Sequence, residues 1–197
     1  MDKIFMKNRK NQRIAVLVDK NENQKGLAFV VHGLGGFKEQ AHIEIFAESF
    51  KENGYTVVRF DTTNTFGESD GDYSDATMTR SYQDLEDVIE WSRNQIWYQE
   101  PFALAGHSLG GAVIILYAEE YSEKVRALAP ISSAIPDLYV SNMDKEVLRK
   151  WKVEGVMDKG ERNSKPGCFM ILKWNFVEDI KRHKLLERAI GITMPIL

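Results

Sequence analysis

Short apolar runs alternate with helical patterns along this sequence, and no other feature limits the fold as strongly. Three continuous apolar runs, at 26–33, 55–61 and 101–108, are typical of strands that are buried on both faces, and a fourth run at 124–134 also predicts a strand. Three segments in which apolar residues recur at helical spacing separate these runs, at 39–51, 78–96 and 109–121. This alternation predicts an α/β fold in which a mostly parallel sheet carries helices on both faces.

The remaining segments add elements at both ends of this pattern. Two short runs at 3–7 and 13–19, separated by polar residues, predict an N-terminal β-hairpin. Between 136 and 170 the apolar periodicity is lost, and we interpret this stretch as a small cap inserted into the domain. An amphipathic helix is predicted over 175–189, and the run at 192–197 predicts the start of a final strand.

The stretch Gly106-His107-Ser108-Leu109-Gly110 matches the pattern G-x-S-x-G at the point where an apolar run meets a helical one. A turn this sharp forces the serine into strained backbone angles, and glycines on both sides remove Cβ atoms that would collide. The Ser108 hydroxyl then projects above the sheet, and the next helix directs its N-terminal amides at a reacting carbonyl group. Ser108 is therefore the candidate catalytic nucleophile, and Gly106 and Gly110 are the candidate glycines of this nucleophile elbow.

Acyl transfer also requires two hydrogen-bond donors that are aimed at the developing oxyanion. The backbone N–H of Leu109 is one candidate, because Leu109 directly follows the nucleophile. The second donor is expected in the loop "HGLGG" at 32–36, after the first of the four apolar runs, and the amide of Leu34 is our candidate. His32 is interpreted as a structural residue that supports this loop.

Three motifs occur in an order that resembles the α/β-hydrolase superfamily: "VVHGLGGFKEQ", "RFDTTNTFGESDG" and "LAGHSLGGAV". Within it, the chain is most similar to serine hydrolases of the monoacylglycerol lipase, cinnamoyl esterase and serine aminopeptidase type, and the likeness covers residues 12–197. The middle motif resembles the D-x-x-G-x-G-x-S-x-G loop of these enzymes. It departs from that loop where Asn64 and Thr65 replace an expected glycine.

This resemblance implies a three-layer α/β-hydrolase sandwich with an eight-stranded sheet, a small cap between strands six and seven, and no metal or organic cofactor. It also implies a catalytic triad in the order serine, acid, histidine. In this family the acid usually follows strand seven and the histidine follows strand eight. Since the run at 192–197 corresponds to strand seven, we expect both groups, strand eight and the last helix beyond Leu197.

Residues within the chain offer alternatives for these two groups. Asp137 follows strand six, where a minority of α/β-hydrolases carry the acid, and a surface or cap-hinge aspartate is the other interpretation. His32 and His107 belong to motif loops, and His42 lies among the polar positions of the first helix. His183 is interpreted either as part of a solvated helix face or as a base that reaches the nucleophile.

Composition excludes several classes of partner and location. The 197 residues carry a net charge of −3, which favours neither nucleic acid nor an anionic membrane. No apolar run approaches the ~18 residues that a transmembrane helix needs. The single cysteine, Cys168, excludes an intrachain disulfide, and the N-terminus lacks the apolar core of a secretory signal. We therefore predict a single domain over 1–197 in the cytoplasm.

Three functional hypotheses follow. The first is the N-terminal part of a serine ester hydrolase, impaired because the acid and histidine are lacking. The second is a module that binds a ligand between elbow and cap without turnover. The third is one half of an enzyme that a C-terminal fragment on a second polypeptide completes.

A small acyl ester is the expected substrate, although the sequence alone leaves thioesters, amides and peptides open. Several apolar side chains are candidates to contact an acyl or aryl group. In the cap, where they could equally form the cap's own core, these are Trp151, Met157 and Phe169, and in the loops they are Phe37 and Phe66.

Overall fold

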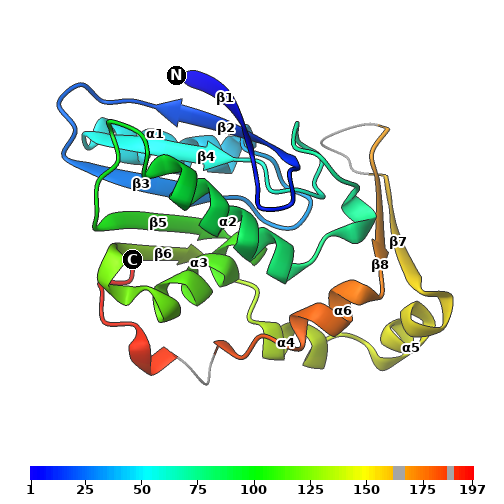
Figure 1. The fold of residues 1–197 in the computed structure, drawn as a ribbon. Helices are drawn as coiled ribbons and strands as arrows, with labels where there is room; N and C mark the ends of the chain where they lie inside the picture. The colour runs from blue at the N-terminus through cyan, green and yellow to red at the C-terminus, as the bar shows by residue number, and fades with distance from the viewer. Residues whose placement is uncertain (162–166, 186–188) are drawn as a thin grey trace.

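Six strands form the central sheet of the computed structural model, which describes residues 1–161, 167–185 and 189–197. Their order across the sheet is β1 (Asp2–Lys7), β2 (Arg13–Asp19), β4 (Tyr55–Phe60), β3 (Gly26–Val31), β5 (Phe102–His107) and β6 (Val125–Ile131) (Figure 1). β1 and β2 form the predicted hairpin, and β2 pairs antiparallel with β4. The strands β4, β3, β5 and β6 run parallel, which confirms the mostly parallel sheet.

The parallel strands β4, β3 and β5 occupy the centre of the sheet because their sequences are apolar on both faces. Every residue of β3 is buried, and so is every residue of β4 after the first. Strands of this kind must be covered on both sides. The three continuous apolar runs therefore identified the buried strands β3, β4 and β5 correctly, whereas β6 at the sheet edge has only Val125 and Leu128 buried.

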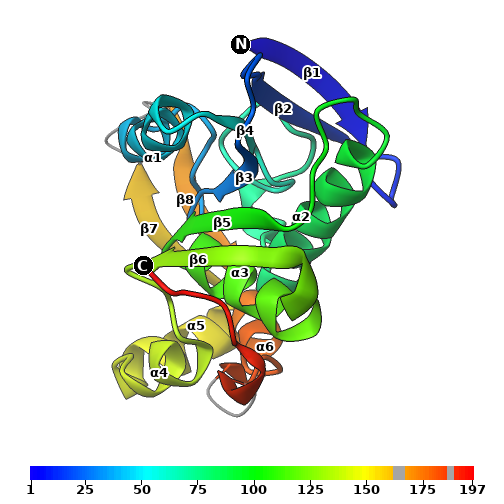
Figure 2. The same ribbon diagram turned by 90° about the vertical axis from the view of Figure 1, so that its left-hand side faces the viewer.

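Helices cover both faces of the sheet and produce three layers (Figure 2). On one face lies α1 (Ala41–Glu52), and on the other lie α2 (Met78–Ser92) and α3 (Leu109–Glu120). The apolar cluster under α1 consists of Val30, Ile43, Ala47, Val57 and Ala105. This layered arrangement confirms the predicted fold class.

The second helix is shorter than the sequence predicts. Thr77 caps its N-terminus by accepting a hydrogen bond from the Arg80 amide. After Ser92 the amide of Gln95 bonds only three residues back, to the Ser92 carbonyl (2.9 Å), so the α-helical pattern does not continue to Ile96. Ile96 is fully exposed, and a longer helix would bury no further apolar surface through it.

A separate group of elements lies beyond the carboxyl ends of β5 and β6 (Figure 1). It comprises α4 (Pro136–Ser141), α5 (Lys145–Glu154), β7 (Val156–Glu161), β8 (Phe169–Lys173) and α6 (Asn175–Ile180). β7 and β8 pair with each other rather than with the main sheet, so the described residues place six strands there and not the eight that the resemblance implies. Short 3₁₀ helices occur at η1 (Tyr73–Asp75), η2 (Ser122–Lys124) and η3 (Ala189–Gly191).

Trp151 forms the centre of this added group. Its indole N–H donates to the Leu172 carbonyl (2.9 Å), and its ring packs against Trp174 and Phe176. The loss of periodicity over 136–170 therefore reflects short elements with an apolar centre of their own. Its role as a cap stays a prediction.

The C-terminal segment agrees with the sequence in its strand and differs in its helix. α6 ends at Ile180 instead of extending to 189, and residues 186–188 lie outside the described part of the chain. Ile196 forms a single parallel bridge with Leu128 of β6. Leu128 donates to the Pro195 carbonyl and accepts from the Leu197 amide, both at 2.9 Å, so the run predicted to begin a final strand pairs beside β6 at this bridge.

Replacement of Phe102 with alanine tests the packing of the central sheet. The Phe102 side chain is fully buried, and its ring meets that of Phe29 edge to face with the centroids 5.0 Å apart. We expect Phe102→Ala to lower the free energy of unfolding by about 3–5 kcal/mol, because a cavity remains where the ring was. The exposed control Ile96→Ala should change it by less than about 0.5 kcal/mol. Equal effects of the two variants in urea unfolding would contradict this packing.

Candidate active site

Ser108 lies at the junction of β5 and α3 in a conformation that few residues with a side chain adopt. Its φ is 53° and its ψ is −115°, which lies outside the sterically free regions. Its N–H donates to the Ile131 carbonyl (3.0 Å), and its carbonyl accepts from the amides of Ala112 (3.2 Å) and Ala134 (3.0 Å). The strain is therefore maintained by bonds to β6 and α3, an arrangement typical of functional sites.

Close backbone contacts require glycine on both sides of Ser108. A Cβ atom on Gly106 would stand 2.4 Å from the Gly110 carbonyl oxygen, and one on Gly110 would stand 2.4 Å from the Val31 carbonyl oxygen. Gly33 approaches the same turn, since a Cβ atom there would lie 3.2 Å from the Ser108 Cβ. The loop after β3 and the elbow after β5 are thus in direct contact.

The loop after β3 folds as a tight turn beside the elbow. The Gly36 N–H donates to the Gly33 carbonyl (2.9 Å), and Gly35 has a left-handed φ of 62°. Leu34 occupies the first central position of this turn, where its own N–H is not needed to close it. Across the described ranges, neither the amide of Leu34 nor that of Leu109 has a hydrogen-bond acceptor. Two amides without an acceptor among the described residues therefore lie on the two backbone segments that meet at Gly33 and Ser108.

His32 connects this turn to the loop after β4. The Thr62 amide donates to its Nε2 (3.0 Å), so the neutral ring carries its proton on Nδ1, which lies 2.8 Å from the Gly33 carbonyl oxygen. The ring is buried. These contacts agree with the loop-supporting position expected for His32.

No described residue forms a hydrogen bond with the Ser108 hydroxyl. His42 and His107 face each other, with ring centroids 4.5 Å apart. His183 Nε2 lies 2.9 Å from the Thr79 hydroxyl oxygen and 3.6 Å from the Asp179 carboxylate. The interpretation of His183 as a solvated residue was wrong, because it packs on the start of α2 and its side chain is only 16% exposed.

Asp179 is held where His183 packs on the start of α2, because it contacts both His183 and Thr79. Burial by itself would raise the pKa of Asp179, but hydrogen bonds from His183 and Thr79 outweigh it and leave that pKa below its usual value. Asp137 is also engaged elsewhere, since its carboxylate lies 2.9 Å from the Lys184 ammonium. This ion pair agrees with the surface or cap-hinge interpretation of Asp137.

The loop after β4 shows why Asn64 and Thr65 can replace the expected glycine. Asn64 has a φ of 58°, in the left-handed region that asparagine tolerates better than most residues. Its side-chain oxygen accepts from the Asp72 amide (3.1 Å). The Thr65 hydroxyl donates to the Gly36 carbonyl. Asn64 thus closes this loop on itself, and Thr65 holds it against the turn that carries Leu34.

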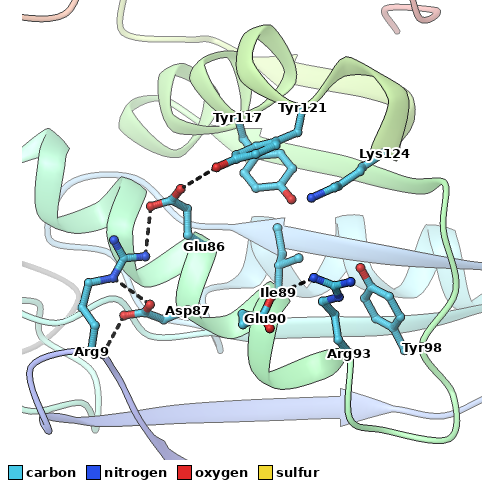
Figure 3. A pocket seen from close by; sticks show the side chains of 10 residues that line it. All are labelled: Arg9, Glu86, Asp87, Ile89, Glu90, Arg93, Tyr98, Tyr117, Tyr121 and Lys124. Carbon is cyan, nitrogen blue, oxygen red and sulfur yellow. Dashed lines mark hydrogen bonds and ion pairs between the residues drawn. The ribbon is translucent and has the colours of Figure 1, made fainter.

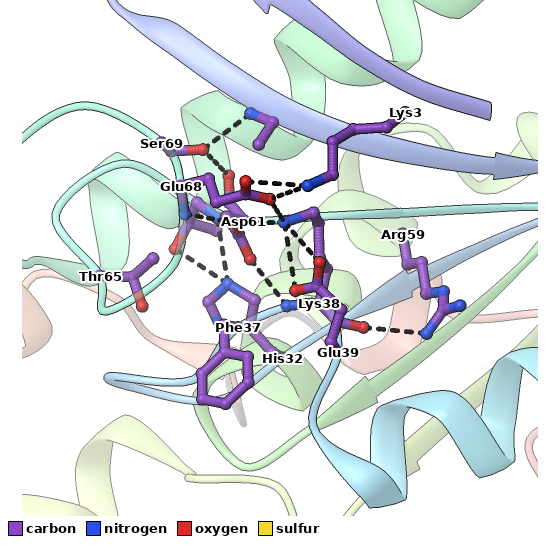
Figure 4. Close-up of polar contacts among 12 residues, drawn as sticks. Lys3, His32, Phe37, Lys38, Glu39, Arg59, Asp61, Thr65, Glu68 and Ser69 are labelled. Carbon is purple, nitrogen blue, oxygen red and sulfur yellow. Dashed lines mark hydrogen bonds and ion pairs between the residues drawn. The ribbon is translucent and has the colours of Figure 1, made fainter. Parts of the chain in front are cut away.

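A buried ion cluster beside this loop was not predicted from the sequence (Figure 4). Lys38 and Asp61 are both fully buried and form an ion pair of 2.8 Å. The Lys38 ammonium also contacts Glu68 at 2.6 Å and Glu39 at 3.0 Å. Burial by itself would lower the pKa of Lys38, but the surrounding carboxylates outweigh it and raise that pKa. The only signal was Asp61, an acidic residue at the end of a buried strand, since Lys38 stands in a polar stretch typical of a surface.

The carboxylates of this cluster are close enough to bind a metal ion. One oxygen from each of Glu39, Asp61 and Glu68 lies within 4.8 Å of the others. However, the Lys38 ammonium lies within 3.0 Å of all three groups. It supplies the positive charge that a metal would bring, so the cluster as observed does not fit a metal centre.

A cavity of about 420 Å³ opens between the end of β6 and α4. Ala134, which bonds to the Ser108 carbonyl, is part of its wall. The other lining residues are Ser133, Ile135, Leu138, Tyr139, Asn142 and Met143. A second cavity, of about 220 Å³, lies between α2 and α3 among charged residues and tyrosines, and no motif residue lines it (Figure 3). Of these two cavities, the first is the one with a lining residue bonded to the candidate nucleophile.

The aromatic residues proposed to contact a substrate are in different surroundings. Trp151 belongs to the centre of the added group, which favours the interpretation as cap core. Phe169 is 56% exposed on β8. In the loop after β4, Phe66 stacks on Tyr73 with ring centroids 4.5 Å apart.

The family model described as "Serine aminopeptidase, S33" matches residues 22–191. The chain belongs to this family of α/β-hydrolases. Solved structures share the fold: the ferulic-acid complex of Est1E from Butyrivibrio proteoclasticus has a TM-score of 0.76 at 22% identity, covering 98% of this chain and 76% of that one. Mouse alpha/beta hydrolase domain-containing protein 10 has a TM-score of 0.77 at 23% identity, covering 100% and 76%. The predicted family and fold are thereby confirmed.

Curated relatives are longer than this chain. The mouse protein named palmitoyl-protein thioesterase ABHD10, mitochondrial, is 29% identical over 180 residues, which are 87% of this chain and 56% of that protein. Its human counterpart is 27% identical over 156 residues, 78% of this chain and 48% of that protein. The chain thus spans about half the length of the curated relatives it matches. Among the described helices, none combines the length and apolar character that crossing a membrane requires.

A methyl group at Gly110 should disrupt the elbow. Its Cβ would meet the Val31 carbonyl oxygen at 2.4 Å, and a backbone atom cannot rotate away. We expect Gly110→Ala to lower the free energy of unfolding by about 1–3 kcal/mol through overpacking. At the matched control Gly191→Ala, the new Cβ would lie at an ordinary 3.6 Å from the Glu119 carbonyl oxygen. Thermal unfolding compares the two, and equal stability would show that the elbow tolerates a side chain.

The ion cluster predicts a specific pH dependence for Glu68. Hydrogen bonds from Lys3 and Lys38 lower its pKa from 4.5 to about 2. Because the folded value lies below the unfolded one, the stabilisation by ionised Glu68 is complete above pH 4.5 and is lost as the pH falls toward 2. Glu68→Gln should therefore be less stable than the native protein at neutral pH, and the two should converge near pH 2. Urea unfolding across this range would contradict the assignment if the gap stayed constant.

Proposed function

We propose that this chain provides the nucleophile and the oxyanion donors of a serine hydrolase that cleaves acyl esters and thioesters. The observation that supports the proposal most strongly is the strained conformation of Ser108, with φ at 53°, at the N-terminus of α3. The amides of Leu34 and Leu109 lie on the two backbone segments that meet there, and neither has an acceptor among the described residues. This combination matches what acyl transfer requires.

In the proposed reaction, Ser108 Oγ attacks the acyl carbonyl carbon and its proton passes to a base. The N–H groups of Leu34 and Leu109 stabilise the oxyanion of the tetrahedral intermediate, and comparable donors contribute about 2.7–4 kcal/mol each. Collapse of the intermediate breaks the bond to the alcohol or thiol, which leaves with a proton. Water then attacks the acyl-serine, releases the acid and restores the hydroxyl. These steps use neither a metal nor an organic cofactor.

The proton acceptor is the part of this reaction that the described residues do not provide. No described imidazole or carboxylate is hydrogen-bonded to the Ser108 hydroxyl. Removing the base of a triad costs about 10⁶ in kcat, while an oxyanion hole and substrate binding alone retain about 10³–10⁴ over water. We therefore expect slow, measurable hydrolysis by these 197 residues.

The relatives support an acyl ester or thioester as the substrate class. One is named a palmitoyl-protein thioesterase, and a fold neighbour was solved with ferulic acid bound. The cavity beside the elbow offers the apolar side chains of Ile135, Leu138 and Met143 to an acyl group. We propose that the acyl chain occupies this cavity.

A base supplied by a second polypeptide is the alternative proposal. It is favoured by the outer edge of β6, which is paired within the described residues only through the bridge between Leu128 and Ile196. Exposed strand edges accept further strands. A C-terminal fragment that adds strands there and carries a histidine would complete the site.

Hydrolysis of p-nitrophenyl butyrate and of a butyryl thioester tests the proposal. The native chain should hydrolyse both slowly, and Ser108→Ala should reduce the rate to background, because the nucleophile is gone. The control Ser49→Ala, on the exposed side of α1, should retain the native rate. Equal rates for the native chain and Ser108→Ala would contradict the assignment. Butyrate binding without any turnover would instead favour a binding module.

A further inference from the structure

Lys38 follows the turn at 33–36 by two residues, and it is the one fully buried lysine among the residues that the structure describes. Each polar group of Lys38 bonds to the end of β4. Its N–H donates to Asp61 (2.7 Å), its carbonyl accepts from Arg59 (3.1 Å), and its ammonium donates to Asp61 (2.8 Å). The end of the turn is therefore fixed by backbone and side chain together.

Asp61 is itself held rigidly. Its N–H donates to the Ala15 carbonyl (2.9 Å), its carboxylate accepts from the Glu68 amide (2.7 Å), and its carbonyl accepts from the Ser69 hydroxyl (2.7 Å). Gly67 packs so tightly against it that a Cβ atom there would lie 2.1 Å from the Asp61 Cγ. Asp61 is thus a fixed point that is continuous with the central sheet.

The beginning of the same turn is fixed at the nucleophile. Gly33 lies against Ser108, because a Cβ atom at Gly33 would stand 3.2 Å from the Ser108 Cβ. Leu34 stands between this contact and the anchor at Lys38. An oxyanion donor must stay within about 0.5 Å of its productive position. A shift of the anchor at Lys38 would therefore be transmitted to the Leu34 amide.

The charge arrangement favours one position of the loop. The ammonium is surrounded by the carboxylates of Glu39, Asp61 and Glu68 at 2.6–3.0 Å. Buried ion pairs add little stability compared with apolar side chains of similar volume, and in some proteins they specify a single geometry. A methionine at position 38 would fill the same space without directing the loop toward Asp61.

We propose that Lys38 is a positioning residue for the oxyanion hole. Its ion pair with Asp61 holds the Leu34 amide at a fixed place relative to Ser108, and Lys38 does not touch the reacting atoms. The inference rests on the proposed function of Ser108 and Leu34.

Lys38→Met and Lys38→Arg test this role, with Arg9→Met as the control. Arg9 forms ion pairs with Glu86 and Asp87 at 3.0 and 2.8 Å, beside the cavity between α2 and α3 (Figure 3). The measurement is the second-order rate constant with which a fluorophosphonate probe labels Ser108, on variants shown to be folded by circular dichroism. Lys38→Met should reduce it about 100-fold, the effect of losing one oxyanion donor. Lys38→Arg, which keeps the charge, should stay within about tenfold of native, and Arg9→Met within about twofold.

If the probe labels Ser108 in folded Lys38→Met as fast as in Arg9→Met, the inference is overturned. If Lys38→Met does not fold, Glu68→Gln replaces it, since that side chain is 42% exposed. A labelling rate below that of Arg9→Met then supports the inference, and an equal rate overturns it.

The failure of the proposed function is a separate outcome. It is recognised when the native chain is labelled no faster than Ser108→Ala. Hydrogen exchange of the peptide covering 32–38 then decides the inference. Faster exchange in the Lys38 or Glu68 variant than in Arg9→Met supports it, and equal exchange overturns it.

Discussion

The candidate site depends on the close approach of two backbones at the carboxyl ends of β3 and β5. Gly110 has space for no side chain beside the Val31 carbonyl, and Gly33 lies directly against Ser108. Because these are contacts of main chain with main chain or with Cβ, rotation of a side chain cannot relieve them. This packing maintains the strain at Ser108, and it brings the amides of two separate loops to one place.

A buried ion pair is the second constraint on the candidate site, and it joins loops rather than strands of the sheet. Lys38 and Asp61 are both fully buried, which is tolerable only because each is paired and hydrogen-bonded. Together with His32, which bridges Gly33 and Thr62, this pair joins the loop after β3 to the loop after β4. These contacts thus link the two loops, each of which contains one of the family motifs, into one structural unit.

The described residues meet only one of the two requirements of the acyl transfer that we propose. The proposed oxyanion donors require only backbone amides, and the contact between the loops after β3 and β5 brings the segments of Leu34 and Leu109 together. Proton transfer requires a side chain within hydrogen-bond reach of the nucleophile. Among the described residues, His32 is bonded to Thr62, His183 contacts Thr79, and the rings of His42 and His107 face each other.

The sequence by itself determined the features that depend on local patterns. Continuous apolar runs identified the buried strands, and the glycines around Ser108 identified the elbow, because sterics restrict such a turn to very few residues. Only the tertiary structure decided the ion pair between Lys38 and Asp61 and the partial burial of His183 against the start of α2. The physical reason is that a polar residue in a short loop has no periodic signal. Its environment is set by partners distant in sequence, which only the packing of the layers brings together.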